Sequence, residues 1–337
     1  MKSRLLTHAV LVTLLSASLV HGAETAPWLT VDGQANFDVR QSSTQEYESN
    51  LRVQDAEVKF ELLVREGIKI ALKTNLDQKL NKGTSGQEFD WGKAIQEAYI
   101  QIQTDKISGL PKATITFGKH AMAFGQKYHE LPMFKDALIT KITKKTEVIG
   151  VTVELPTDFF KIIDSVAISV FEATGGDLKI ANEKGASMRL TKKISDQMTA
   201  QISALISEKV NSNDLEKRGS VGFIFTTKDG KRKIWAEGVI VDDSPLIDKT
   251  TLGAQVGASS QLGAGTIVIE YQYLHDQAHE IAAAYNLPVG TWLVLSPEIR
   301  FRKDLSGKKE DETVIGIRAR IKAHFEAKHN LLKGNEN

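Results

Sequence analysis

The chain has 337 residues, of which 41% are hydrophobic and 25% are charged; its formal net charge is +1 and it contains no cysteine. A chain without cysteine has no disulfide scaffold and no cysteine-based zinc site, and a net charge near zero gives no reason to expect nucleic acid as a partner. No Pro/Ser-rich linker divides the sequence, so we predict a single domain after an export signal.

The export signal is the first predicted element. Lys2 and Arg4 precede an apolar run from Ala9 to Val20, and the small residues Gly22 and Ala23 follow it. A basic start, a short apolar run and small residues at the cleavage site are typical of a secretory signal peptide. The run is shorter than the ~20 residues that cross a bilayer as a helix. We therefore predict a cleaved signal peptide over 1–23.

The segment that follows, 29–40, alternates apolar and polar residues without interruption. A period of two is that of a β-strand with one apolar and one polar face. The pattern returns over 56–65, over 68–77 and, late in the chain, over 315–325, where Phe325 ends it. Mean hydropathy is mildly negative, and no later apolar run is long enough for a membrane-spanning helix. An exported chain of this kind is typical of a transmembrane antiparallel β-barrel of the cell outer membrane.

Over the predicted barrel, 24–325, these patterns predict sixteen strands, an even number as bacterial outer-membrane barrels require. Fourteen or eighteen strands are the alternatives. Links after even-numbered strands are mostly short and those after odd-numbered strands tend to be long, which places both termini in the periplasm together with the tail 326–337. The predicted strands are 28–40, 52–65, 68–77, 95–103, 113–119, 147–155, 165–172, 187–192, 197–207, 219–227, 232–241, 251–260, 266–274, 278–287, 291–302 and 313–325.

Three residues inside the predicted strands indicate local departures from a regular ladder. Pro297 cannot donate a backbone hydrogen bond, so it predicts a bulge in the fifteenth strand. Gly150 and Gly222 predict places where the backbone bends or packs closely.

The two faces of the predicted strands meet different surroundings. The residues predicted to face lipid are Leu29, Val31, Phe37, Val58, Phe60, Leu62, Ile315, Ile317 and Ile321. The charged residues predicted to line the lumen are Asp32, Asp38, Asp55, Glu57, Glu61, Arg300, Arg302, Arg318, Arg320 and Lys322. The acidic ones come from the first two strands and the basic ones from the last two, so we expect two opposed walls and a field across the lumen. The alternative is that these charges pair across the lumen and hold it open.

The most distinctive stretch runs from Ile115 to Leu155. A strand ends in Gly118-Lys119, Phe124-Gly125 follows, and a long link leads to the strand at 147–155. At these residues the chain resembles the phosphate-selective porin family and its siderophore-porin relatives, which show a strand ending in Gly-Lys/Arg/Gln, then Pro-Phe-Gly, then a long third loop. Three further segments resemble the same family: 51–77, 94–102 and 282–304.

The resemblance implies a trimeric diffusion pore of sixteen strands whose third loop folds into the lumen as a constriction. Ala123 stands where the family usually has proline, and the dense arginine ladder of a strict phosphate channel is absent, so the solute does not follow from the resemblance. Lysines outnumber acidic residues in the third link, which predicts a modest anion preference. The candidate constriction residues are Lys127, His129, Lys135, Lys141, Lys144 and Lys145.

No pattern of an enzyme is found in the sequence: there is no cysteine nucleophile, no His-Glu-x-x-His and no phosphate-binding glycine loop. We expect a porin that passes small hydrophilic solutes or anions down their gradients and needs neither a cofactor nor a metal. Its expected partners are outer-membrane lipid, these solutes and further copies of the chain in a homotrimer. The alternatives are a phosphate- or siderophore-specific channel, a barrel enzyme, a plugged structural or adhesion barrel, and a secreted β-sandwich binding protein.

Overall fold

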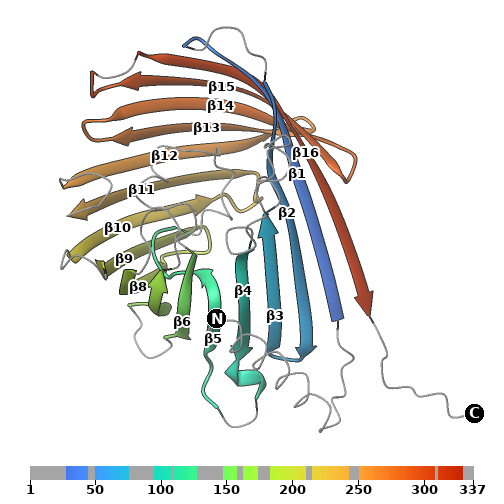
Figure 1. The fold of residues 1–337 in the computed structure, drawn as a ribbon, viewed down its shortest axis with the longest axis vertical. Helices are drawn as coiled ribbons and strands as arrows, with labels where there is room; N and C mark the ends of the chain where they lie inside the picture. Colours follow the sequence, from blue (N-terminus) through green and yellow to red (C-terminus); the bar gives the residue numbers. More distant parts are fainter. Residues whose placement is uncertain are drawn as a thin grey trace, which may run out of the picture.

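In the computed structural model the chain forms one antiparallel sheet that closes into a barrel (Figure 1). The structure describes residues 28–44, 50–75, 95–107, 110–126, 147–157, 162–173, 183–209, 215–242, 250–307 and 310–328. No helix in these ranges is long and apolar enough to cross a membrane. The strands are β1 (Trp28–Ser42), β2 (Asn50–Arg65), β3 (Ile68–Asn75), β4 (Ile95–Gln103), β5 (Thr114–Ala121), β6 (Glu147–Pro156), β7 (Ser165–Ala173), β8 (Glu183–Lys193), β9 (Met198–Lys209), β10 (Leu215–Thr226), β11 (Arg232–Asp242), β12 (Thr251–Leu262), β13 (Gly265–Leu274), β14 (Ala278–Val289), β15 (Leu293–Asp304) and β16 (Glu312–Lys328).

The first and last strands close the barrel. Each strand pairs with its neighbours in chain order, and β1 also pairs with β16, with Trp28 opposite Lys328 and Ser42 opposite Val314. A closed sheet has no free edge, so the strand backbones are paired within the sheet itself. The β-sandwich alternative is therefore wrong, because the two faces of the strands are the inside and the outside of one barrel.

All sixteen predicted strands are present at their predicted places, so the predicted strand count is confirmed. Several strands are longer than predicted. β8 begins at Glu183, opposite Lys209 of β9, and β10 begins at Leu215, opposite Glu208. β16 runs to Lys328, beyond the predicted end of the barrel. In each case the local alternation is weak, and backbone hydrogen bonds to a neighbouring strand extend the strand. Local sequence patterns do not contain information on this pairing.

The two ends of the barrel differ in their connections, and we name them the turn end and the loop end. The turn end carries Trp28, Lys328 and the links after even-numbered strands, such as Glu66-Gly67 between β2 and β3. Gly67 has a φ of 83°, and an added Cβ would lie 2.5 Å from Lys106 Cβ, so this turn requires glycine. The loop end carries the links after odd-numbered strands, including the third link, 122–146.

Pro297 lies in β15 without the predicted bulge. The register of β15 with β14 is the same on both sides of it, and Pro297 stands opposite Ile317 in a regular pairing with β16. The preceding residue, Ser296, donates from Oγ to Asn286 Oδ1 of β14 at 2.7 Å. A side-chain hydrogen bond thus joins β14 and β15 beside the position where proline has no N–H to donate.

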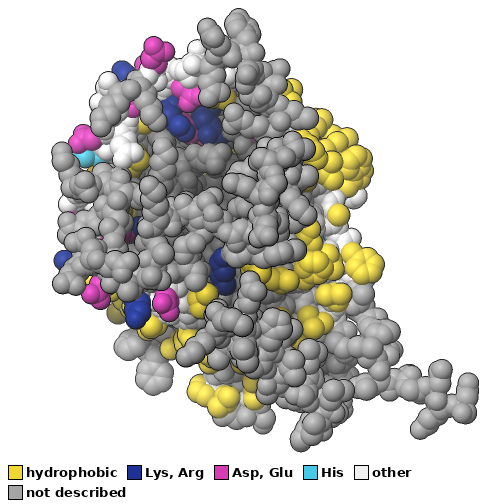
Figure 2. All heavy atoms as spheres, in the orientation of Figure 1, with side chains coloured by type: hydrophobic (Ala, Val, Ile, Leu, Met, Phe, Trp, Pro, Cys, Tyr) yellow, Lys and Arg dark blue, Asp and Glu magenta, His cyan; other side chains and the backbone are white. Residues whose placement is uncertain are grey.

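The outer face of the barrel is apolar, as the alternation predicts. Ile315 and Ile317 of β16 are 59% and 56% exposed, while Gly316 and Arg318 between and beside them are buried on the inner face. Phe60 of β2 is exposed in the same way. Figure 2 shows apolar side chains gathered on one side of the barrel wall. This surface has the character of a face that meets lipid.

Candidate functional site

The inner wall carries a set of buried glutamates that the sequence analysis did not select. They project from β10, β11, β13, β14 and β15, and they are Glu216, Glu237, Glu270, Glu280 and Glu298. Each has a polar partner on a neighbouring position: Arg218, Ser220, Gln272, Arg302 and Arg318, respectively. A buried carboxylate needs such partners because its desolvation is otherwise costly. In the sequence these glutamates can be identified because each occupies a polar position in a strand whose residues alternate between apolar and polar.

The predicted lumen charges of β1, β15 and β16 form ion pairs with side chains of neighbouring strands along the wall. Arg318 Nε donates to Asp38 Oδ1 at 2.9 Å, and Arg318 Nη2 lies 3.4 Å from Glu298 Oε2. Arg302 Nη2 lies 2.6 Å from Glu280 Oε2. Because β1 pairs with β16, the acidic strands β1 and β2 adjoin the basic strands β15 and β16. The expected opposed walls are therefore not formed, and these charges compensate each other between neighbouring strands.

Two further arginines predicted to line the lumen also contact polar side chains of a neighbouring strand. Arg320 Nε donates to Asn36 Oδ1 of β1 at 3.0 Å, and Arg300 Nε lies 3.8 Å from Glu280 Oε1. Asp55 lies in β2, and its side chain is outside the described part of the structure. Of the remaining four, Asp32, Glu57 and Lys322 line a cavity inside the barrel. The fourth, Glu61, pairs with Lys59 of the same lining.

The third link is described as far as Gln126, and its first residues, Met122–Gln126, lie against the inner wall. The backbone N–H of Ala123 donates to Ser169 Oγ of β7 at 2.8 Å, and that of Gly125 donates to Ser203 Oγ of β9 at 3.1 Å. The segment is buried along its whole length. It therefore crosses the inside of the barrel wall from β5 toward β11.

Gln126 ends this segment in a clip between β10 and β11. Its backbone N–H donates to Glu237 Oε1 at 3.1 Å, and its side-chain Nε2 donates to the carbonyl oxygens of Phe223 at 3.1 Å and Ala236 at 2.7 Å. An added Cβ at Gly222 would lie 2.5 Å from Gln126 Nε2. Close packing at Gly222, predicted from the sequence, is confirmed, and its reason is the room it leaves for Gln126. We call these contacts the Gln126 clip.

Close packing is confirmed at Gly150 as well. An added Cβ there would lie 2.8 Å from Phe171 Cα of the neighbouring strand β7. The aromatic ring of Phe171 in turn belongs to an apolar cluster on the inner wall. The glycine therefore lets two neighbouring backbones approach beside this cluster.

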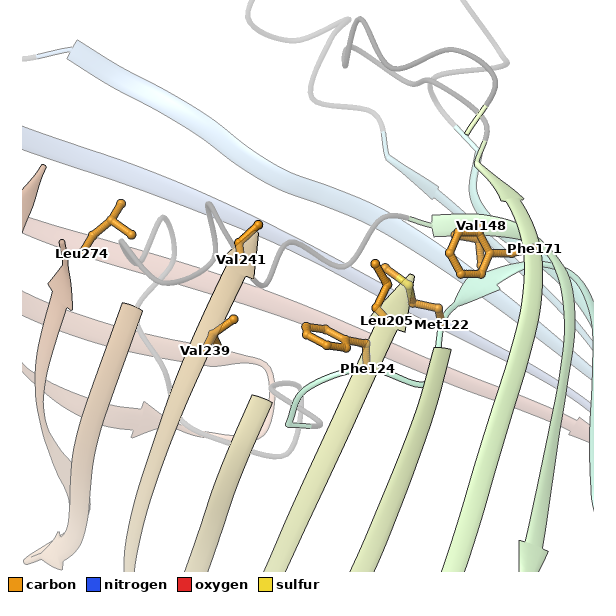
Figure 3. Close-up of a cluster of buried hydrophobic side chains, with 8 residues drawn as sticks. All are labelled: Met122, Phe124, Val148, Phe171, Leu205, Val239, Val241 and Leu274. Atoms are coloured by element: carbon orange, nitrogen blue, oxygen red, sulfur yellow. The ribbon is translucent and has the colours of Figure 1, made fainter. Parts of the chain in front are cut away.

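Part of the lumen wall is apolar (Figure 3). Met122 and Phe124 of the third link belong to a cluster of buried side chains with members from β6, β7, β9, β11 and β13. A second cluster centres on Trp235 of β11, which is fully buried. The strand members of the first cluster are Val148, Phe171, Leu205, Val239, Val241 and Leu274. Apolar contacts therefore hold the start of the third link against the wall together with its hydrogen bonds.

A cavity of about 1190 Å³ lies toward the turn end, beside Met122, Ala123 and Phe124. It is lined by β1 to β6, β8 and β16 and by Trp292 of the link between β14 and β15. Its polar lining includes Asp32, Glu57, Tyr99, His120, Arg189 and Lys322. The described interior thus holds a polar cavity, and the apolar cluster that contains Phe124 lies beside it.

Five titratable side chains cross the cavity wall in a single row. In the strand register His324 stands opposite Asp32, Asp32 opposite Lys59, Lys59 opposite Lys73, and Lys73 opposite Glu97. All five line the cavity. We call this set the charge row. It follows from the register of five neighbouring strands, which the sequence alone does not specify.

Most charges of the row are compensated close by. His324 Nδ1 lies 2.6 Å from Asp32 Oδ1, and Lys59 Nζ lies 3.1 Å from Glu61 Oε1. Lys73 Nζ lies 2.9 Å from Glu57 Oε2, although Glu97 stands directly across from it in the register. The cavity wall therefore offers a largely balanced set of charges to a solute.

The candidate constriction residues lie outside the described residues: Lys127, His129, Lys135, Lys141, Lys144 and Lys145. The anion preference that they predict stays a prediction. Among the described residues, no group of three or more His, Asp or Glu side chains is placed to hold a metal ion.

No protein-family model matches the chain, and no curated protein matches it in sequence. Solved structures match its fold. The outer membrane channel DcaP of Acinetobacter baumannii matches with a TM-score of 0.60 and 13% sequence identity, over 88% of this chain and 96% of that chain. OmpT of Vibrio cholerae, an outer membrane protein folded in vitro and solved in its trimer form, matches with a TM-score of 0.59 and 12% identity, over 88% of this chain and 100% of that chain.

An anion-selective porin from Comamonas acidovorans is also similar. It matches with a TM-score of 0.57 and 12% sequence identity, over 89% of this chain and 100% of that chain. At identities this low the likeness is one of fold, and it identifies a porin-like barrel.

Proposed function

We propose that the mature chain forms a water-filled channel in the outer membrane for the passive diffusion of small hydrophilic solutes. The observation that carries the proposal is a closed barrel with an apolar outer face around a charged cavity of about 1190 Å³. Closure is the way in which a β structure pairs its backbone inside a bilayer, and a polar hollow interior provides a path for water and solutes. The fold that the chain shares with outer-membrane channels and porins supports the same conclusion.

The test of this function is the current through the purified, refolded chain, 24–337, in a planar bilayer. We expect discrete conductance steps, and we expect vesicles that contain the protein to swell in solutions of small sugars. A specific observation favours a second candidate, a plugged structural barrel, because the apolar cluster around Phe124 fills part of the lumen. A barrel that folds, as judged by circular dichroism, but conducts no current would support the plugged barrel and overturn the channel.

Export and orientation are part of the proposal. The segment 1–23 lies outside the described residues, and we propose that it directs export to the periplasm and is then removed. The described barrel has Trp28 and Lys328 at its turn end. We propose that this end faces the periplasm, because long links of outer-membrane barrels lie on the outside.

The ends of the third link support a constriction of the lumen. Gln126 is held at β10 and β11, whereas Glu147, where the described chain resumes, stands opposite Ala121 of β5. We propose that the link 127–146 returns between these points through the lumen and narrows it. Such a loop places its charges where low-dielectric walls strengthen their action on ions.

The lysines of this link support a weak anion preference, and Lys144 and Lys145 are the first candidates because they closely precede β6. Replacing both with glutamate is expected to move the zero-current potential, measured across a potassium chloride gradient, toward cation preference. A wild-type pore that already prefers cations would contradict the proposed anion preference. An unchanged potential in the double variant would show that these lysines lie outside the constriction.

We propose that the channel assembles as a homotrimer in outer-membrane lipid. Small residues on the outer face of β9 and β12 support close contact between copies: Ala200, Ala204, Ala254 and Ala258. The similar OmpT structure from Vibrio cholerae is a trimer form. Light scattering of the refolded protein in mild detergent is expected to give the mass of three chains. A monomer under these conditions would contradict the proposal.

A phosphate- or siderophore-specific channel is the alternative within the same class. The described lumen favours a general channel, because its arginines Arg302 and Arg318 are occupied by Glu280, Glu298 and Asp38. An arginine that is held by a carboxylate is not available for the bidentate pairing by which arginine binds phosphate.

A further inference from the structure

We propose that the cavity at the turn end is a weak binding site for zwitterionic solutes of the size of short peptides. The inference rests on the proposed channel function and names the class of solute that the channel favours. Three charged side chains of its described lining have no ion-pair or hydrogen-bond partner: Glu97 of β4, Glu154 of β6 and Lys322 of β16. Two of them are acids and one is a lysine, and all three share one cavity, so the ammonium group of a zwitterion can meet one of the acids while its carboxylate meets the lysine.

The unpaired state of Glu97 follows from its neighbours. Lys73 stands across from Glu97 in the register but forms its ion pair with Glu57, at 2.9 Å. Lys59, one strand further, is paired with Glu61 at 3.1 Å. The carboxylate of Glu97 therefore faces the hollow of the cavity with no lysine bound to it, and it is available to an ammonium group.

Lys322 is free for a similar reason. It stands opposite Gln34 of β1, whose amide donates to Glu57 at 2.9 Å. The neighbouring acid, Asp32, is bound to His324 at 2.6 Å. The ammonium group of Lys322 is consequently the free cation of the described lining, and it can receive a carboxylate from a solute.

The unpaired acids and the unpaired lysine lie on separate parts of the cavity wall. Glu97 and Lys322 are four strand steps apart, from β4 through β3, β2 and β1 to β16. At ~4.8 Å per step this is about 19 Å along the curved wall, and the two long side chains shorten the gap between the charged groups. A peptide of two or three residues, about 7 to 10 Å long when extended, matches a gap of this kind.

The balance of charge favours a zwitterion over a simple ion. The described lining has four carboxylates and four lysine or arginine side chains: Asp32, Glu57, Glu97 and Glu154 against Lys59, Lys73, Arg189 and Lys322. Apart from His324, which is bound to Asp32, these charges balance, so the cavity attracts neither cations nor anions strongly, but separated charges on its wall orient a dipolar solute. This distinguishes the cavity from a site for phosphate or for a metal cation.

The experiment compares four peptides with the same backbone on the refolded channel in a planar bilayer at pH 7. Trialanine is the zwitterion, trialanine amide the cation, N-acetyl-trialanine the anion, and N-acetyl-trialanine amide the neutral form, since the free termini are charged at this pH. We expect trialanine added at the turn-end side to cause the most frequent and longest interruptions of the current. Equal effects of all four peptides would overturn the proposal.

Variants of the cavity residues test the binding site separately from the channel function. The double variant Glu97→Gln/Glu154→Gln and the variant Lys322→Gln are each expected to shorten trialanine interruptions by roughly fivefold, the effect of an ion pair in a solvated site. Glu66→Gln is the matched control, because Glu66 lies at the turn end, outside the lining, and pairs with Lys106. Cavity variants that behave like this control would overturn the proposal. If no current is seen at all, the proposed channel function is overturned. Calorimetric titration of the folded protein in detergent with trialanine then still tests whether the cavity binds the peptide.

Discussion

Replacing Gly222 with valine is expected to release the start of the third link from the wall and to increase the single-channel conductance. The new Cβ would lie 2.5 Å from Gln126 Nε2, and Gln126 is fully buried and donates from this nitrogen to two carbonyl oxygens. Losing these two hydrogen bonds and overpacking the site destabilise the clipped arrangement by about 2–4 kcal/mol. The measurement is conductance in planar bilayers, together with the rate at which vesicles swell in sugars of increasing size.

Gly238→Val is the matched control for this variant. Gly238 lies in β11, next to β10, and an added Cβ there would meet no atom within 4 Å. We expect this control to keep the wild-type conductance and the wild-type sugar size limit. A Gly222→Val channel that equals the control would show that the Gln126 clip does not set the width of the lumen.

Replacing Ile317 or Phe60 with lysine is expected to prevent stable assembly in lipid. Both side chains are exposed on the outer face, Ile317 at 56% and Phe60 at 40%. A lysine on the lipid face near the bilayer midplane costs about 2–4 kcal/mol, because its charge leaves water without a partner. The measurement is the free energy of unfolding of the refolded protein in lipid vesicles, obtained by titration with guanidinium chloride.

Gln101→Lys is the matched control, since Gln101 lies on the inner face of β4 and lines the cavity. We expect it to change the free energy of unfolding by less than either outer-face variant. Equal losses at the outer and inner positions would contradict the assignment of the two faces.

Much of the barrel could be predicted because the required signal is local. The alternation over 29–40 assigns an inner and an outer face residue by residue, and each strand repeats that information independently. The close packing at Gly150 and Gly222 was likewise predictable, because a glycine inside a strand pattern commonly indicates that another segment approaches the backbone closely. The bulge predicted at Pro297 was wrong, because a missing donor can be accommodated when neighbouring side chains such as Ser296 bridge the strands.

The number of strands, their faces and the polar character of the lumen follow from local patterns, since these features depend on residues two positions apart. Which charges meet depends on the closed fold. Closure brings β1 beside β16 and pairs Asp38 with Arg318, 280 positions away in the chain. Register leaves Glu97 and Lys322 unpaired, and the path of the third link brings Gln126 to β11. These contacts join segments distant in sequence, and their geometry depends on the closed sheet, whose pairing no local pattern encodes.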